Sequence, residues 1–225
     1  MFTGIVESKG VLEKIELVGK GAHIRVRTKP GFLAGRVHLG DSIATNGVCL
    51  TATYLEEQAY EADLSFESFA LTCFHLYHPG QAVNLELACT PATRLGGHIM
   101  QGHVDGIGTV LERFHVDGAQ NVWVQAPASL QHYIAMKGSI AVDGISLTVN
   151  EVRGQDFRLT LIPFTQNEVA SDLRPGTKVN LEVDVLARYL ERLLDRANSP
   201  SAGKNSVSES QGGLSLATLQ QNGFI

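Results

Sequence analysis

Two matched triplets, residues 49–51 (Cys-Leu-Thr) and 146–148 (Ser-Leu-Thr), carry side chains that could do chemistry. Each follows an expected tight turn, Asn46-Gly47 or Asp143-Gly144. Successive side chains of a strand point to opposite faces, so the outer members of each triplet lie side by side. A thiol or hydroxyl pair placed in this way can hydrogen-bond a polar ligand. The alternative for Cys49 is a buried thiol that packs as a small apolar side chain.

His103 is the side chain best suited to proton transfer, because imidazole titrates near neutral pH. The alternative is a structural histidine that hydrogen-bonds the backbone where two domains join. His75 and His78 stand three residues apart without a carboxylate partner at ligand-like spacing, which indicates surface histidines and no metal site.

An internal duplication must position these groups. Residues 42–51 (SIATNGVCLT) match residues 139–148 (SIAVDGISLT) at six of ten positions. Pro79-Gly80 and the VNLE at 83–86 recur at 175–176 and 179–182. At the amino terminus we align Gly4-Ile5 with Gly106-Ile107, so that the separation falls from 102 to 97 to 96 residues. The pattern predicts two copies of a domain of about 95 residues.

Each copy has the signature of antiparallel β-structure. Residues 23–27 and 121–125 alternate between apolar and polar side chains, as half-buried strands do. Short strands at this spacing predict a small closed barrel in each copy. An apolar stripe at helical spacing along DVLARYLERLLDR predicts a C-terminal helix. The Ser- and Gly-rich residues that follow predict a flexible linker and tail.

Composition narrows the class of protein. The 225 residues carry 18 basic and 23 acidic side chains, a net charge of −5, which argues against nucleic acid as a partner. Three cysteines without a CxxC motif argue against a disulfide scaffold and favour a reducing compartment. We see no signal peptide and no apolar run long enough to span a membrane, so we expect a soluble cytoplasmic protein.

Three segments together resemble one enzyme family: MFTGIV at the amino terminus, LGGHIMQGHVDG at 95–106, and the paired NGVCLT and DGISLT segments. The pattern is similar to riboflavin synthase of the α-chain type, built from two lumazine-binding repeats. The resemblance implies an all-β fold: a tandem pair of similar six-stranded Greek-key-type antiparallel β-barrels with a C-terminal α-helix. It divides the chain into barrels at 1–97 and 98–186, an oligomerisation helix at 187–196, and a linker and tail at 197–225.

The resemblance also implies the reaction. Two molecules of 6,7-dimethyl-8-ribityllumazine exchange a four-carbon unit and give riboflavin and 5-amino-6-(ribitylamino)uracil, with no cofactor and no metal. The family is a homotrimer whose active site, holding two lumazines, lies between the N-terminal barrel of one subunit and the C-terminal barrel of a neighbour. Lumazine synthase is a candidate partner. A reaction between two identical molecules needs two similar pockets, which a duplicated domain supplies.

The resemblance assigns catalytic roles to His103, Cys49, Phe2 and Asp184. His103 would remove a proton from the C7 methyl group of a lumazine, and Phe2 would hold the amino terminus by packing. Asp105 aligns with Thr3 and is expected to point away from His103, in a loop-shaping or ribityl-binding role. The remaining expected substrate contacts are Gly4, Ile5, Val6, Leu50, Thr51, Asp63, Leu64, Ser65, Phe66, Glu67, Ser68, Val104, Lys137, Ser146, Leu147, Thr148, Ile162, Pro163, Phe164, Thr165, Gln166 and Asn167.

Two other classes compete. A lumazine or flavin carrier on the same fold would lack the MFTGIV segment, Cys49 and His103, which are all present here. A flavin-dependent reductase domain would carry a flavin signature and a dinucleotide-binding domain. The Gly106-Ile107-Gly108 segment alone is too weak a motif for such a domain.

Overall fold

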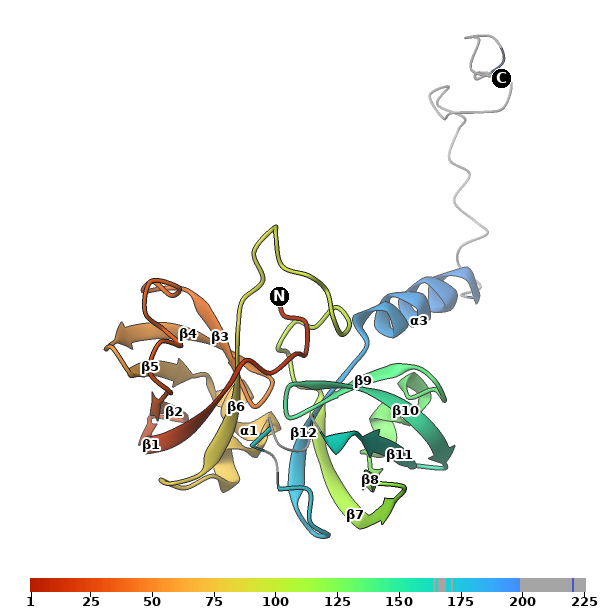
Figure 1. Ribbon diagram of the computed structural model, residues 1–225. Helices are drawn as coiled ribbons and strands as arrows, with labels where there is room; N and C mark the ends of the chain where they lie inside the picture. Colours follow the sequence, from red (N-terminus) through yellow and green to blue (C-terminus); the bar gives the residue numbers. More distant parts are fainter. Residues whose placement is uncertain (164, 166–168, 171, 199–219, 221–225) are drawn as a thin grey trace. The chain divides into compact units, whose positions relative to one another are not determined.

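The structure is a computed structural model that describes residues 1–163, 165, 169–170, 172–198 and 220. Two closed antiparallel barrels of six strands each form the body of the chain (Figure 1). The expected all-β fold with two repeats and a C-terminal helix is therefore confirmed.

The first barrel contains β1 (Ser8–Val18), β2 (Gly21–Arg27), β3 (Ser42–Thr45), β4 (Val48–Leu55), β5 (Ala59–Leu64) and β6 (Ala82–Leu87). Its strands pair in the order β1-β2-β5-β4-β3-β6. A short helix α1 (Phe66–Leu71) and a 3-10 turn η1 (Cys73–Leu76) lie between β5 and β6. The alternation of the sequence predicted the strands but not α1.

The second barrel contains β7 (Gly106–Val116), β8 (Ala119–Gln125), β9 (Ser139–Val142), β10 (Ile145–Arg153), β11 (Asp156–Leu161) and β12 (Lys178–Val183), with a 3-10 turn η2 (Ala128–Tyr133). Its order around the barrel, β7-β8-β11-β10-β9-β12, repeats that of the first. Helix α3 (Val185–Asn198) follows. It includes the first two residues of the expected linker and tail. The rest of that segment, apart from Gln220, lies outside the described residues.

The alternation rule holds on the strands that carry the triplets. Leu50 and Leu147 are buried in the two barrel cores, whereas the triplet residues on either side of each leucine are half-buried or exposed on the outer faces. The expected placement of the small polar groups of each triplet on one face of the strand is thus confirmed, and that face is the outer one. These leucines can offer a ligand only their backbone.

The barrels meet at the two turns that precede the triplets. A Cβ added at Gly47 would lie 2.7 Å from the Gly144 nitrogen, and one added at Gly144 would lie 2.7 Å from the Gly47 nitrogen. Around this contact, the Asn84 amide donates to the Asp143 carbonyl and the Asn180 amide donates to the Asn46 carbonyl, each at 2.9 Å. The contact is therefore symmetric and leaves no room for a side chain on either glycine.

Candidate functional site

The N-terminal segment, residues 2–7, is held by one buried carboxylate. Glu86 accepts hydrogen bonds from the Thr3 amide (2.6 Å), the Thr3 hydroxyl (2.7 Å) and the Gly4 amide (3.0 Å). Burial raises the pKa of Glu86, while these hydrogen bonds to its ionised form act in the opposite direction. The Gly4 carbonyl then accepts from the Ser146 amide at 2.9 Å, so the segment joins the first barrel to the second.

The bridge, residues 98–105, repeats this arrangement with the barrels exchanged. Glu182 accepts from the Gln101 amide (2.6 Å) and the Gly102 amide (2.9 Å). The Gly102 carbonyl accepts from the Cys49 amide at 2.8 Å. Each barrel therefore receives a strand-like segment that is anchored on the other barrel.

The alignment of Gly4 with Gly106 is wrong. Gly4 and Gly102 are counterparts, because both have positive φ (+78° and +79°) and make equivalent backbone hydrogen bonds across the barrels. Their separation is 98 residues rather than 102. A match of two residues, Gly-Ile, is too short to identify the true counterpart. It cannot distinguish a glycine that must adopt positive φ from Gly106, which begins β7.

A cleft of about 430 Å³ lies beside Cys49, and we call it the repeat-1 cleft. Its volume falls within the usual range for small-molecule sites, about 300–1,000 Å³. Five expected contact residues line it: Cys49, Glu67, Ser68, His103 and Val104. Four further residues that line it were not expected from the sequence: Val48, Leu71, Thr72 and Gly102.

Helix α1 explains two of the missed residues. Ser65 caps its N-terminus by accepting from the Ser68 amide at 3.0 Å. On a helix, residues four apart share a face, so Leu71 follows Glu67 and Thr72 follows Ser68 into the cleft. A serine followed by an acidic residue in the first turn was the available signal for a helix start.

Asp105 does not point away from His103. Both residues line a smaller cleft of about 240 Å³ together with Gln101 and Arg188, because residues two apart in an extended chain share a side. Asp105 accepts from the Val183 amide at 2.7 Å and pairs with Arg188 on α3. Burial raises the pKa of Asp105, and the Arg188 charge opposes this shift.

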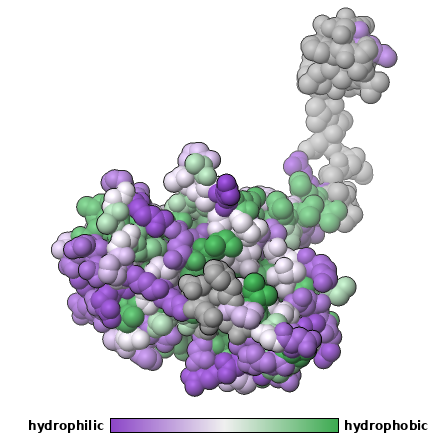
Figure 2. Space-filling model, in the orientation of Figure 1, coloured by the Kyte–Doolittle hydropathy of each residue, from purple (hydrophilic) through white to green (hydrophobic). Residues whose placement is uncertain are grey.

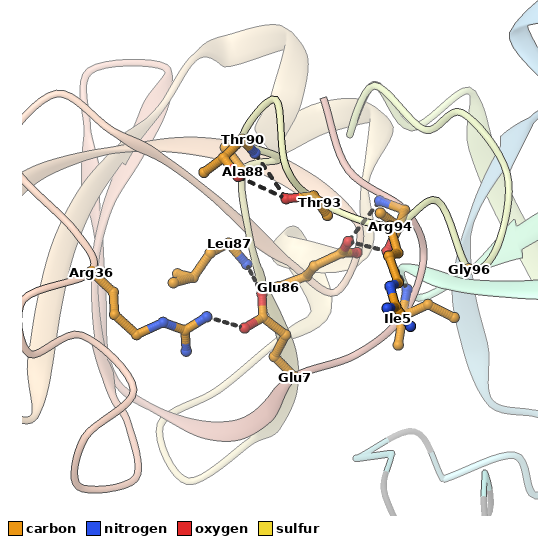
Figure 3. Close-up of a pocket in the computed structure, with 11 residues that line it drawn as sticks. Ile5, Glu7, Arg36, Glu86, Leu87, Ala88, Thr90, Thr93, Arg94 and Gly96 are labelled. Carbon is orange, nitrogen blue, oxygen red and sulfur yellow. Dashed lines mark hydrogen bonds and ion pairs between the residues drawn. The ribbon is translucent and has the colours of Figure 1, made fainter.

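The true counterpart of Asp105 is Glu7 rather than Thr3. Glu7 accepts from the Leu87 amide at 2.9 Å and pairs with Arg36. Figure 3 shows these contacts beside a cleft of about 570 Å³ on this side of the N-terminal segment, with Glu86 reaching the segment. The two acid–arginine pairs therefore fix the N-terminal segment and the bridge in the same way. We call these two the crossing segments.

In the second repeat Ser146 lies half-buried on the outer face of β10. Val6 packs against the second barrel, as Val104 packs against the first. Ile162 and Pro163 are exposed and Thr165 is half-buried. Phe164, Gln166 and Asn167 lie outside the described residues.

Several expected contacts lie outside the repeat-1 cleft as it stands. Leu64 is buried in the barrel, and Asp63 is bound to His23 with an oxygen 2.7 Å from its Nδ1. Phe66 is 60% exposed beneath the Lys20 ammonium group. Ile5 lines the cleft of Figure 3 instead. Thr51 and Thr148 are exposed on the outer strand faces.

Phe2 and Asp184 have clear structural positions. Phe2 is fully buried with Met100 between the barrels, and these two residues exchange backbone hydrogen bonds of 2.8 and 3.1 Å. The phenyl ring therefore anchors the segment, and its catalytic role stays a prediction. Asp184 accepts from the Leu186 amide at 3.0 Å at the start of α3.

Lys137 adopts a backbone conformation that L-residues avoid, with φ of +68°. Its amide donates to the Val149 carbonyl at 2.7 Å. In the first repeat Gly40 takes the same place, with φ of +90° and an amide that donates to the Ala52 carbonyl. Lys137 thus carries left-handed backbone strain at a position where the first repeat has a glycine.

His98 is a further residue of interest that was not expected from the sequence. This residue is only 8% exposed, and its Nδ1 lies 2.7 Å from the Ser146 hydroxyl oxygen. Within the described part of the chain, no group of three or more His, Cys, Asp or Glu side chains could hold a metal ion, and no helix has the length and apolar character to cross a membrane.

The chain is similar to proteins of one family. The model of the lumazine binding domain matches it twice, at residues 3–88 and 101–184. A riboflavin synthase of Photobacterium phosphoreum is 45% identical over the full length of both chains. One from Mycobacterium bovis is 43% identical over 88% of this chain and all of its own, and one from Bacillus subtilis is 34% identical over the full length of both.

A solved structure shares the fold. The crystal structure of LumP complexed with 6,7-dimethyl-8-(1'-D-ribityl) lumazine covers 81% of this chain and 99% of its own, with a TM-score of 0.73 and 22% identity. The doubled lumazine-binding domain and the extent of identity along the whole chain lead to one conclusion: the protein belongs to the riboflavin synthase family.

Proposed function

We propose that the protein is a riboflavin synthase, a transferase that converts two molecules of 6,7-dimethyl-8-ribityllumazine into riboflavin and 5-amino-6-(ribitylamino)uracil. The observation that carries the proposal is the pair of crossing segments, which meet Cys49 and Ser146 through equivalent backbone hydrogen bonds, with the repeat-1 cleft beside Cys49. A dismutation of one compound needs two similar pockets. The names and full-length identity of the relatives support the same reaction.

In this proposal His103 transfers the proton of the C7 methyl group. Its place in the repeat-1 cleft beside Cys49 and Val104 supports the assignment. Cys49 and Ser146 contact the two ring systems through their side chains, and Lys137 contributes a positive charge to the second pocket. No cofactor and no metal take part.

The test is incubation of the purified protein with 6,7-dimethyl-8-ribityllumazine alone, with products followed by chromatography and absorbance. Riboflavin and the uracil product are expected in equal amounts. Tight binding without turnover would make the protein a carrier, and absence of both would overturn the proposal.

Replacing Lys137 with glycine is expected to separate stability from binding. The change relieves about 1–2 kcal/mol of left-handed backbone strain and costs about 0.5–1 kcal/mol in chain entropy. The free energy of unfolding should therefore stay the same or rise slightly, while lumazine affinity falls. Urea unfolding and fluorescence titration measure the two quantities. Lys29→Gly, at an exposed lysine of the first repeat, is the control; equal affinity losses in both variants would contradict a site role.

We also propose that the chain forms a homotrimer through α3, with each active site between barrels of neighbouring subunits. The support is an apolar stripe on the helix, whose large side chains are 57–64% exposed: Leu186, Tyr189, Leu190, Leu193 and Leu194. Figure 2 shows hydrophobic surface along this helix.

A Leu190→Asp/Leu194→Asp double variant is expected to sediment as a monomer and to lose riboflavin formation, since each site then lacks its second barrel. Arg192→Gln, on the other side of the helix, is the matched control and should remain trimeric. A double variant that keeps the wild-type sedimentation coefficient would remove the helix from the interface.

The cellular setting is part of the same proposal. Free Cys49, Cys73 and Cys89 suit a reducing compartment, which supports a cytoplasmic enzyme. Lumazine synthase is the partner we propose there, because its product is the substrate of this reaction.

A further inference from the structure

The two equivalent pocket residues, Cys49 and Ser146, differ in their partners. Both sit on the outer face of a strand, and the amide of each donates to the carbonyl of a crossing glycine. The Ser146 hydroxyl oxygen lies 2.7 Å from Nδ1 of His98. Among the residues that the structure describes, none hydrogen-bonds the Cys49 thiol. The two equivalent positions are thus chemically unequal.

His98 is fixed in place by the crossing segments. Its amide donates to the Thr3 carbonyl at 3.2 Å, and only 8% of its surface is exposed. A Cβ added at the preceding Gly97 would lie 2.1 Å from the Thr3 carbonyl oxygen and 2.8 Å from the Ser146 hydroxyl oxygen. The backbone therefore passes directly against Ser146 and leaves the imidazole little freedom.

The second ring nitrogen of His98 determines how the pair is protonated. Nε2 is buried and has no hydrogen-bond partner among the described residues. A buried N–H without an acceptor costs more than a buried lone pair without a donor. The favourable tautomer therefore carries its proton on Nδ1 and donates it to the Ser146 oxygen. Burial also lowers the pKa of His98, against a smaller opposing effect of the Asp184 charge, so the ring is neutral near pH 7.

We propose that His98 is a positioning residue that makes Ser146 a hydrogen-bond donor toward the lumazine in the second pocket. The Ser146 oxygen accepts from His98, so its own proton points outward to a ring nitrogen or carbonyl of the ligand. The first pocket offers a thiol, which donates only weakly. This inference rests on the proposed function and assigns a polar anchor to one of its two pockets.

The test uses His98→Asn and His98→Gln, each in the wild-type and the Ser146→Ala background. The asparagine Nδ2 takes the position of the histidine Nδ1, whereas a glutamine amide reaches the position of Nε2. In the wild-type background His98→Gln is expected to lower kcat/KM about tenfold, the effect of one lost hydrogen bond. His98→Asn should stay within about threefold of wild type. Neither should have a further effect when Ser146 is alanine.

Three outcomes would overturn the inference: equal losses in the Asn and Gln variants, a full His98→Gln effect without Ser146, or wild-type rates throughout. If the His98 variants do not fold, Ser146→Cys tests the same point, because Cys49 already occupies the equivalent backbone position. It should lose about tenfold in kcat/KM, and wild-type kinetics would overturn the inference. Wild-type protein without turnover would instead refute the proposed function.

Discussion

Replacing His103 with alanine is expected to lower kcat by about 10²- to 10⁴-fold, the usual contribution of a general acid or base. Lumazine affinity should change little, because the imidazole is one of nine residues around the repeat-1 cleft. Single-turnover kinetics and equilibrium titration give the two values separately.

His38→Ala is the matched control, since the His38 side chain is 83% exposed and does not line the repeat-1 cleft. It should turn over lumazine at the wild-type rate. Equal losses of turnover and affinity in His103→Ala would mean that this residue only orients the substrate.

Replacing Gly144 with alanine is expected to lower the free energy of unfolding by about 2–5 kcal/mol. A left-handed alanine costs about 1–2 kcal/mol, and forced overpacking adds about 1–3 kcal/mol. The added methyl group would lie 2.7 Å from the Gly47 nitrogen and 3.0 Å from its Cα. These atoms belong to the backbone of a tight turn in the other barrel, which cannot move aside as a flexible side chain can. Urea unfolding at fixed pH measures the change.

Gly118 provides the control for this measurement. It has the same φ of +79°, and a Cβ added there meets no atom within 4 Å. Gly118→Ala should therefore cost only the strain, and the difference between the variants isolates the steric cost of the barrel contact. Equal destabilisation in both would show that the Gly47–Gly144 contact tolerates a methyl group.

The repeat and its strands could be predicted because they depend on local patterns. Leu50 and Leu147 point inward and their polar neighbours outward, as the two-residue period of a strand requires. The same rule should have placed Asp105 on the side of His103, two residues away. The helical spacing of the last apolar residues likewise predicted α3.

The remaining features depend on long-range contacts that no local pattern encodes. The equivalence of Gly4 and Gly102 appears only once each glycine meets the opposite barrel. His98 contacts Ser146, which lies 48 residues away in the sequence. A single histidine in the bridge does not predict this contact. Leu71 and Thr72 were missed for a different, local reason, because the start of α1 after Ser65 was not recognised.

The crossing segments also bear on how the chain folds. Residues 1–189 form one compact unit although they contain two complete barrels. Opening the first barrel around Cys49 breaks its hydrogen bond to Gly102, and releasing the amino terminus uncovers Ser146 in the second barrel. Neither half can therefore lose its order without exposing part of the other, so the free energy of unfolding is shared between them. We therefore expect the two barrels to unfold together in one transition rather than one after the other.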